Sequence, residues 1–358
     1  MRKRHITSLV SIAAAAAAGL GVIAPSGPAA AAGGHVVRPG QSIQAAVDAA
    51  QPGDTIFVRP GTYRESVLIT TPGLTLRGAG DRTVIKPGAS EDRTENACAK
   101  AGNGICVLGT AQDTVDDVSI RSLTVSGFAR SGIWASWTDG LEVRSVTAAS
   151  NKVWGIAQQR STRSDLRHNT ARSNGDAGIF VANSVDEEGG ATDTGGTRVR
   201  GNTLTDNRIG FTARRVRNLV VKHNTFTANC SGVFVVGDEG TPQAGAMTVR
   251  SNRIVGNNKF CAATERLPAI QGSGIVLTGT ESTEVRSNVI RDNVGATPLS
   301  GGVVLFKSFV GAKNTDNTIS DNTVLGNQPA DLADQDTAGR GNRFTGNVCT
   351  TSAPAGMC

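Results

Sequence analysis

The sequence predicts an all-β solenoid, in which short strands stack coil upon coil, and three observations lead to this fold class. The segment 219–229, LVVKHNTFTAN, has the pattern apolar-x-Val-basic-x-Asn-x-apolar-x-x-Asn. Related copies begin at Leu141, Arg198, Thr248, Glu284 and Thr318. A Gly-apolar pair returns at intervals that are never shorter than 22–23 residues, and Asn pairs five residues apart accompany most copies. Each copy is too short to bury its own apolar face, so the copies must stack on one another.

Each repeat contains three strand signals, which predict a triangular coil. The first is Gly-apolar-x-apolar, the second is apolar-x-Val, and the third is the apolar position between the two Asn. Three strands of a few residues at about 3.3 Å per residue, joined by turns, make one coil. The glycine suits a bend or a close backbone approach. Its positions are Gly104, Gly132, Gly155, Gly178, Gly210, Gly232, Gly274 and Gly302.

The Asn pairs predict turns that stack in register. Asn tolerates the left-handed conformation, and its amide can both donate and accept along a ladder. The pairs are Asn169/Asn174, Asn202/Asn207, Asn224/Asn229, Asn252/Asn257, Asn288/Asn293, Asn322/Asn327 and Asn342/Asn347. This structural role is favoured over sugar binding by the same amides.

The first 32 residues have the composition of a secretory signal peptide. A basic start, Arg2–Arg4, precedes an alanine-rich apolar stretch and the small residues Ala29–Ala32. We therefore expect a secreted, extracellular and monomeric protein whose mature chain starts near Gly33. The net charge of +6 includes three basic residues of this segment, so the remainder carries about +3, which gives no case for nucleic acid. No later apolar run approaches the roughly 18 residues of a membrane span.

Six cysteines in an exported chain indicate three disulfides, for which 15 connectivities exist. Pairing of sequence neighbours, which would close a loop or pin an end, is the simplest choice. It gives Cys98–Cys106, Cys230–Cys261 and Cys349–Cys358. No CxxC or Cys/His cluster supports metal ligation instead.

The entry segment predicts a cap for the open end of the stack. Ser42–Ala50 reads as a short amphipathic helix, and such a cover protects exposed strand edges. Strands are expected at 55–59, 66–69 and 74–76. The predicted organisation is 1–32 signal peptide, 33–103 cap and first coils, 104–345 repeats and 346–358 a disulfide-closed tail.

The stretch VVRPGQSIQAAVDAAQPGDTIFVRPGTYRESV, together with the N-x-apolar-x-x-N repeats, resembles the right-handed parallel β-helix proteins of the pectin-lyase-like superfamily. The resemblance covers nearly all of the mature chain and implies that fold. It does not imply one activity, because such helices include lyases, hydrolases, esterases, epimerases and non-catalytic binding proteins. The Asp-Pro-His-Asp motif of alginate epimerases, the calcium-binding aspartate and arginine motif of pectate lyases, and the calcium-binding nonapeptide repeat are not found. No catalytic residue is carried over.

A column of cations is expected on one outer face, because strands alternate inward and outward side chains. It contains Arg77, Arg121, Arg144, Arg167, Arg200, Lys222, Arg250 and Arg286, and Ser320 ends it. Like charges about 4.8 Å apart repel, so something must offset them. Carbonyls and acids such as Glu142 and Glu284 are the favoured offset, and a bound polyanion such as a uronic-acid polymer is the alternative. Arg167, Arg200, Lys222 and Arg250 are then candidate ligand contacts.

Aromatic side chains form a second outward set, and exposed aromatics suit stacking on sugars. Insertions near Glu187 and Cys261 are expected to cover Phe180 and Phe234. The better sugar platforms are Trp134, Trp137 and Trp154.

Loops after the Gly-apolar strands bring acids and arginines to similar places in consecutive coils. They are Asp186, Glu187 and Glu188, then Arg214 and Arg215, then Asp238 and Glu239. Paired acids can hydrolyse a glycosidic bond. Alternatively, carboxylates can hold Ca²⁺ against a uronate while an arginine abstracts the C5 proton. A solvated, salt-bridged loop edge is at least equally favoured. His168 and His223, just before a turn Asn, are expected to bond the turn rather than transfer protons.

The leading interpretation is a secreted protein that binds an acidic polysaccharide, with lyase-type elimination as the enzymatic version. The alternatives are a non-catalytic carbohydrate-binding or cell-surface repeat protein, and a glycoside hydrolase. A further one is an accessory β-helix for metal-enzyme assembly, against which the lack of Cys/His/Met clusters argues.

Overall fold

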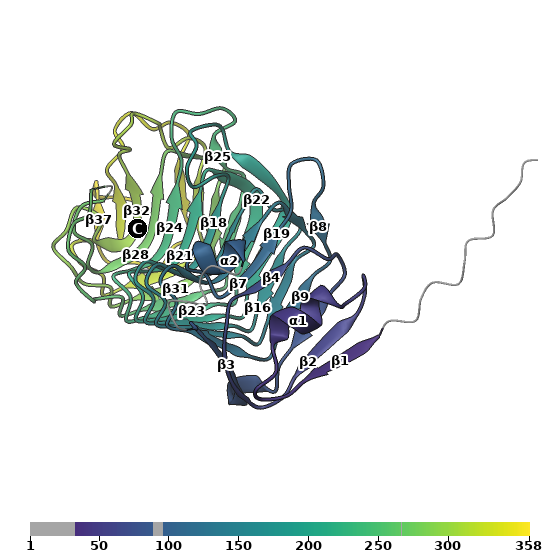
Figure 1. The fold of residues 1–358 in the computed structure, drawn as a ribbon. Helices are drawn as coiled ribbons and strands as arrows, with labels where there is room; N and C mark the ends of the chain where they lie inside the picture. Colours follow the sequence, from purple (N-terminus) through teal and green to yellow (C-terminus); the bar gives the residue numbers. More distant parts are fainter. Residues whose placement is uncertain (1–32, 89–95, 266) are drawn as a thin grey trace, which may run out of the picture. The chain divides into compact units, whose positions relative to one another are not determined.

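The computed structural model describes residues 33–88, 96–265 and 267–358, and these residues wind into stacked three-strand coils (Figure 1). The predicted signal peptide, 1–32, lies outside the described residues. The strands form three long sheets in which neighbouring strands are parallel, and each sheet takes one strand per coil. This is a right-handed parallel β-helix, as the sequence predicts.

We name the three sheets A, B and C. Sheet A contains β1 (Gly34–Val37), β2 (Thr55–Val58), β5 (Thr75–Arg77), β9 (Ser119–Arg121), β13 (Glu142–Arg144), β16 (Asp165–Arg167), β19 (Thr192–Arg200), β22 (Val216–Lys222), β26 (Thr248–Arg250), β30 (Glu284–Arg286), β33 (Thr318–Ser320) and β36 (Arg343–Thr345), with β25 (Ala244–Gly245) and β29 (Thr280–Glu281) beside them. Sheet B contains β3 (Gly61–Arg64), β6 (Thr83–Lys86), β10 (Thr124–Ser126), β14 (Thr147–Ala149), β17 (Thr170–Arg172), β20 (Thr203–Thr205), β23 (Thr225–Thr227), β27 (Arg253–Val255), β31 (Val289–Arg291) and β34 (Thr323–Leu325). Sheet C contains β4 (Val67–Ile69), β7 (Ile105–Leu108), β11 (Ser131–Ser136), β15 (Trp154–Gln159), β18 (Ala177–Ala182), β21 (Ile209–Arg214), β24 (Ser231–Val236), β28 (Ser273–Thr278), β32 (Gly301–Phe306), β35 (Leu332–Asp334) and β37 (Ser352–Ala353). A separate ribbon pairs β8 (Val115–Asp116) with β12 (Thr138–Asp139).

The interior of the coils is apolar, and alternation along each strand decides which side chains enter it. In the segment 219–229, Leu219, Val221 and Phe226 are almost fully buried in one continuous core. Lys222, next to Val221, points outward and is partly exposed. The repeat pattern therefore fixes the two faces of every strand.

A short helix covers the N-terminal end, as predicted. Helix α1 spans Ile43–Asp48, and Ser42 caps it by accepting from the backbone N–H of Ala45. Ile43 and Val47 enter the core. Glu65 accepts from the backbone N–H of Ile43 at 2.8 Å, which ties the helix to the first coil. A second helix, α2 (Ala97–Lys100), and a 3₁₀ turn (Gly80–Arg82) complete this end. Within the described ranges, no helix has the length and apolar character needed to cross a membrane.

The first coils contain strands that the sequence did not indicate. β1, β3 and β6 were not expected, and the strand expected at 74–76 begins one residue later. In β3 the inward side chain is Tyr63, whose hydroxyl donates to the carbonyl of Arg59 at 2.9 Å. This single aromatic residue, preceded by Gly61, hides the alternation that the later coils display.

The asparagines form two long ladders inside the turns. One ladder runs through Asn169, Asn202, Asn224, Asn252, Asn288, Asn322 and Asn347. The other runs through Asn151, Asn174, Asn207, Asn229, Asn257, Asn293 and Asn327, and it ends on Asp331. Each amide of a ladder accepts from the coil before it, as the sequence predicts.

Two details of the Asn prediction are wrong. The left-handed conformation belongs to the residue before the Asn, as at His168 and His223 with φ of 54° and 56°, and not to the Asn itself. The last pair is also shifted by one place. Asn347 stacks on Asn322, and Asn342 stacks on Asn317 at an additional corner.

The recurring glycine of sheet C has a steric cause. A Cβ on Gly155 would lie 2.5 Å from the carbonyl oxygen of Gly178 and 2.8 Å from Nδ2 of Asn174. The same two neighbours, a backbone carbonyl and a ladder amide, crowd Gly132 and Gly178. Only glycine lets the backbone approach the ladder this closely.

Three disulfides join sequence neighbours, and the pairing is the predicted one. They are Cys98–Cys106, Cys230–Cys261 and Cys349–Cys358. Cys230–Cys261 fixes the insertion that follows Asn257 against sheet C. Cys349–Cys358 closes the tail that supplies β37.

Candidate functional site

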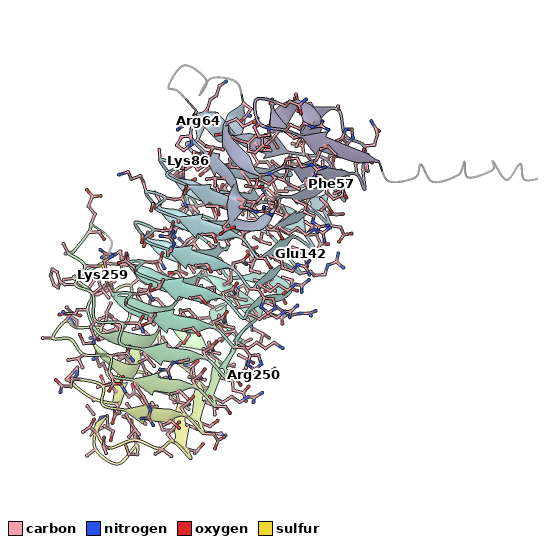
Figure 2. All side chains as sticks on the ribbon, turned by 90° about the horizontal axis from the view of Figure 1, so that it is seen from below. Phe57, Arg64, Lys86, Glu142, Arg250 and Lys259 are labelled. Carbon is pink, nitrogen blue, oxygen red and sulfur yellow. A yellow bond between two sulfur atoms is a disulfide. The ribbon has the colours of Figure 1, made fainter. Side chains whose placement is uncertain are left out.

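The outer face of sheet A carries an unbroken column of cations, which we call the basic ladder. It consists of Arg77, Arg121, Arg144, Arg167, Arg200, Lys222, Arg250 and Arg286, paired in register from β5 to β30. Figure 2 shows Arg250 on the same edge of the solenoid as Glu142 and Phe57. The column predicted from the repeat is therefore present, and Ser320 follows Arg286 in it.

Carboxylates neutralise the middle of the basic ladder. Arg167 contacts Glu142 and also lies 3.2 Å from Asp165, while Arg200 binds Asp165 at 2.6 Å. Burial favours the neutral acid of Glu142, but hydrogen bonds from Arg167 and Ser119 outweigh burial and hold its pKa below the usual value. Hydrogen bonds and charge from Asp165 raise the pKa of Arg200 against the effect of burial. Arg167 and Arg200, two of the candidate ligand contacts, are thus already engaged by carboxylates of the protein.

The two ends of the basic ladder are different. Arg286 lies 2.9 Å from Glu284, but in the described parts of the chain no ion pair joins the remaining members, those other than Arg167 and Arg200, to a carboxylate. These members are Arg77, Arg121, Arg144, Lys222 and Arg250. Arg77 instead lies over the ring of Phe57, 5.9 Å from its centroid, and Nε of Arg121 is buried without a hydrogen-bond partner. Acids therefore offset only part of the repulsion.

The predicted loop cluster is brought together around Arg215. Its side chain is only 2% exposed, and it lies 2.6 Å from Glu188 and 3.0 Å from Asp238. It also donates to the carbonyl of Glu187 at 3.0 Å. Arg215 thus joins loops of consecutive coils, and its burial between two carboxylates supports a structural role.

A shallow groove lies beside this cluster, and we call it the loop groove. It has a volume of about 410 Å³, and its lining includes Trp137, Arg160, Asn183, Ser184, Glu187 and Glu188. Arg160 lies over the ring of Trp137, 5.1 Å from its centroid, and pairs with Glu187. Arg160 directly follows β15, one coil before the predicted acids, and was not among the residues predicted from the sequence.

The remaining predicted members are not among the residues that line the loop groove. Arg214 donates to the carbonyl of Val185 at 3.3 Å, and Asp238 accepts from the backbone N–H of Gly240 at 3.0 Å. Asp186 and Glu239 do not line the loop groove. The loops do approach one another around Arg215, but ion pairs and turn hydrogen bonds engage most of their charged side chains.

The predicted aromatic platform is largely internal. The rings of Trp134 and Trp154 stack with centroids 5.7 Å apart, and Trp154 stacks on Phe180 at 4.6 Å. Trp154 is 7% exposed, so the expectation that its face is open to a sugar is wrong. Its indole N–H donates to Asp176 at 3.0 Å. Arg130 lies over both indoles, and Trp134 remains partly exposed.

The insertions cover sheet C as expected. Phe180 and Phe234 are both buried. Phe234 belongs to an apolar cluster with Ile270 and Leu299, and Cys261 packs against this cluster. The outward face of the C-terminal half of sheet C is therefore part of a second core and not a binding surface.

No group of three or more His, Cys, Asp or Glu side chains is arranged to hold a metal ion in the described ranges. All six cysteines are in disulfides. His168 and His223 lie in register on either side of Gly201, and the His168 ring reaches over that glycine. The carboxylate set that would support Ca²⁺ is thus not assembled in the part of the chain that the structure describes.

Comparison with solved structures gives the same fold at low sequence identity. The A-module of the Azotobacter vinelandii mannuronan C-5 epimerase AlgE6 matches with a TM-score of 0.58 and 20% identity, covering 85% of this chain and 88% of that one. An alginate lyase from Paenibacillus matches with a TM-score of 0.56 and 14% identity, covering 81% and 94%. A DFA-IIIase from Arthrobacter chlorophenolicus matches with a TM-score of 0.57 and 15% identity, covering 84% and 79%.

Family models identify the chain more directly. Residues 186–356 match a model described as right handed beta helix region. No curated protein sequence matches. The model described as periplasmic copper-binding protein (NosD) matches residues 47–266, more than half of the chain. Together with the disulfides, this description indicates an extracytoplasmic protein. The chain belongs to the NosD family and has the right-handed parallel β-helix fold.

Proposed function

We propose that this protein binds an acidic polysaccharide outside the cytoplasm, along the basic ladder of sheet A. The observation that carries the proposal is the incomplete neutralisation of the ladder. Among the described residues, five members form no ion pair with a carboxylate: Arg77, Arg121, Arg144, Lys222 and Arg250. Cations that repel one another at about 4.8 Å favour a ligand that carries negative charge along its length.

The arrangement suits a polymer better than a small anion. The unpaired cations are spread over several coils instead of converging on one point. A uronic-acid polymer presents one carboxylate per sugar and can follow such a column. Mannuronan and alginate, which appear in the names of structurally similar proteins, belong to this class. They support the choice of ligand class only as analogy.

Binding is preferred over catalysis because the charges of the loop cluster are already engaged. Arg215 is buried between two carboxylates, and Glu187 is paired with Arg160. Elimination needs a base next to the sugar C5 proton, and hydrolysis needs a separated acid and base. The loop groove supplies Trp137 as a further sugar contact.

The binding test compares two faces of the same coils. Polygalacturonate and alginate are titrated into the mature protein at low and high salt. Lys222→Gln with Arg250→Gln should weaken binding about 10-fold, since each removes a charge-assisted contact, and added salt should weaken it further. Arg253→Gln, which removes an exposed cation from sheet B, is the matched control. Equal losses in both variants would reject the ladder as the binding face.

A second measurement separates binding from lyase activity. The same polymers are incubated with and without Ca²⁺ while the absorbance of unsaturated products is followed. The binding proposal expects a flat trace with retained affinity. A rising trace that Glu187→Ala or Arg214→Ala removes would instead assign elimination to the loop cluster.

Copper binding is a second candidate, favoured by one observation. His168 and His223 flank Gly201 at the same turn position of alternate coils, and both are exposed. Imidazole suits copper, and the glycine between the two rings leaves space. Titration of Cu²⁺ followed by the visible absorption of the bound ion tests this. His168→Ala with His223→Ala should abolish binding, whereas His35→Ala should not. Unchanged binding in the double variant rejects the pair.

A further inference from the structure

A second cationic feature lies on sheet B, away from the basic ladder. The last outward positions of β3 and β6 are Arg64 and Lys86, which pair in register. Farther along the same column stand Ser126, Ala149 and Arg172, also in register. Figure 2 shows Arg64 and Lys86 on the edge of the solenoid opposite Glu142 and Arg250. Cations thus stand at both ends of this five-coil segment, with two small side chains between them.

The small side chains leave a groove of about 440 Å³. Lys86 and Arg64 stand at one end and Arg172 at the other, and the hydroxyls of Thr124, Ser126 and Ser150 line the space between them. Among the residues that the structure describes, no carboxylate lines the groove. It therefore combines three positive charges with hydrogen-bonding hydroxyls.

The charges of this groove are not neutralised in the described structure. No ion pair with a carboxylate is formed there by Arg64, Lys86 or Arg172, and all three side chains are exposed. Arg64 and Lys86 are directly opposite on adjacent strands, where like charges destabilise a sheet. An anionic group between them would remove this repulsion.

We propose that this groove binds a short oligosaccharide with two anionic groups. One anionic group contacts Arg64 and Lys86, and the other contacts Arg172. The strands that carry Lys86 and Arg172 are three steps apart, or about 14 Å at the usual spacing of strands. That span exceeds a single anion and fits a chain of a few sugars, whose hydroxyls face Thr124, Ser126 and Ser150. The site does not depend on the proposed function, because it lies on another sheet.

The test uses two probes that share the charge but differ in its source. Tetragalacturonate carries carboxylates only, and a sulfated maltotetraose carries sulfates only. Each is titrated calorimetrically into the mature protein. Binding of either one supports the site, and the stronger of the two identifies the anion.

Variants then separate a shaped groove from general electrostatic attraction. Lys86→Gln and Arg172→Gln should each weaken binding about 10-fold. Ser126→Gln fills the groove without changing charge and should abolish binding, provided that its thermal unfolding matches the wild type. Arg253→Gln is the charge control on the same sheet, and Lys222→Gln with Arg250→Gln is the control for the basic ladder.

Three outcomes would overturn the proposal. One is the absence of binding by both probes. Another is a loss of affinity in the Arg253 or ladder variants equal to that in Lys86→Gln, which would place the ligand elsewhere. The last is full affinity in Ser126→Gln, which would show that the space between the cations is not occupied. Failure of polymer binding on sheet A would leave all three readings unchanged.

Discussion

Asn224 donates twice to the same atom of Asn252: its backbone N–H and its side-chain amide both reach Oδ1 at 3.0 Å. The amide also donates to the carbonyl of Val199 at 2.9 Å. Asn224 in turn accepts two hydrogen bonds from Asn202. One buried side chain thus connects three coils, and every polar atom of the amide is used.

Asn224→Ala should therefore destabilise the protein strongly. The substitution leaves two donors of Asn202 and the carbonyl of Val199 without partners in a buried place, which costs about 3 kcal/mol of the free energy of unfolding. Urea unfolding measures the loss. Thr203→Ala, an exposed position on the neighbouring strand, should change the free energy by less than about 0.5 kcal/mol. Similar values for the two variants would contradict the ladder's role.

Gly155→Ala should be destabilising although it adds one methyl group. The new Cβ would lie 2.5 Å from a carbonyl oxygen of the next coil, so the backbone must shift, at about 1–3 kcal/mol. Gly34→Ala is the control, since its Cβ would meet only the ring of Phe57 at 3.5 Å. Thermal unfolding of the two variants should differ clearly, and equal midpoints would disprove the steric explanation.

Gln158→Met should stabilise the protein. Gln158 points into the coil interior, is 1% exposed, and neither polar atom of its amide has a hydrogen-bond partner. Methionine has a similar length and removes this penalty, a gain of about 1–2 kcal/mol. The adjacent Gln159→Met should do the opposite, because Gln159 binds Ser136 and the backbone N–H of Val185. Stabilisation in both variants would point to a general effect of hydrophobicity.

Asp331 should make stability depend on pH at the end of the second ladder. It accepts from both N–H groups of Asn327, at 3.0 Å each, and from Thr350 and Thr351. Burial favours the neutral acid, but these hydrogen bonds outweigh burial and lower the pKa of Asp331. Its contribution is therefore present above the usual pKa of an aspartate, about 3.9, and is lost as the pH falls through the lower folded value.

The comparison with Asp331→Asn tests this dependence. Free energies of unfolding are measured by urea between pH 3 and 7. The variant should be less stable than the wild type at neutral pH, because its new NH₂ faces the N–H donors of Thr350 and Thr351. The difference should shrink at the acidic end of the range. Parallel curves for the two proteins would refute the assignment.

The repeat made most of the fold predictable. Alternation around Val221 and the spacing of Asn224 and Asn229 define two corners and two faces, so the register of distant coils could be counted from the chain. The residue with the left-handed backbone was missed, although Gly201 and Gly256 occupy that column and indicate it. The strands of the first coils were predicted less completely, because Gly61 and Tyr63 interrupt the alternating pattern.

The candidate sites were less predictable, because they depend on the insertions. The cations of sheet A follow from counting, but the acids that pair with Arg167 and Arg200 were only partly foreseen. Burial of Trp154 depends on its stacking between Trp134 and Phe180, which no local pattern shows. The groove between Lys86 and Arg172 was missed because the segment between β6 and β10 obscures their common column.

One disulfide links the oxidation state of the protein to the covering of sheet C. Cys230–Cys261 fixes one insertion across sheet C as part of the outer layer that covers Phe234. A reducing environment would therefore leave an apolar strip of the sheet open while the stacked turns remain. Oxidation of this one cysteine pair therefore controls whether that side of the solenoid is covered or apolar and open.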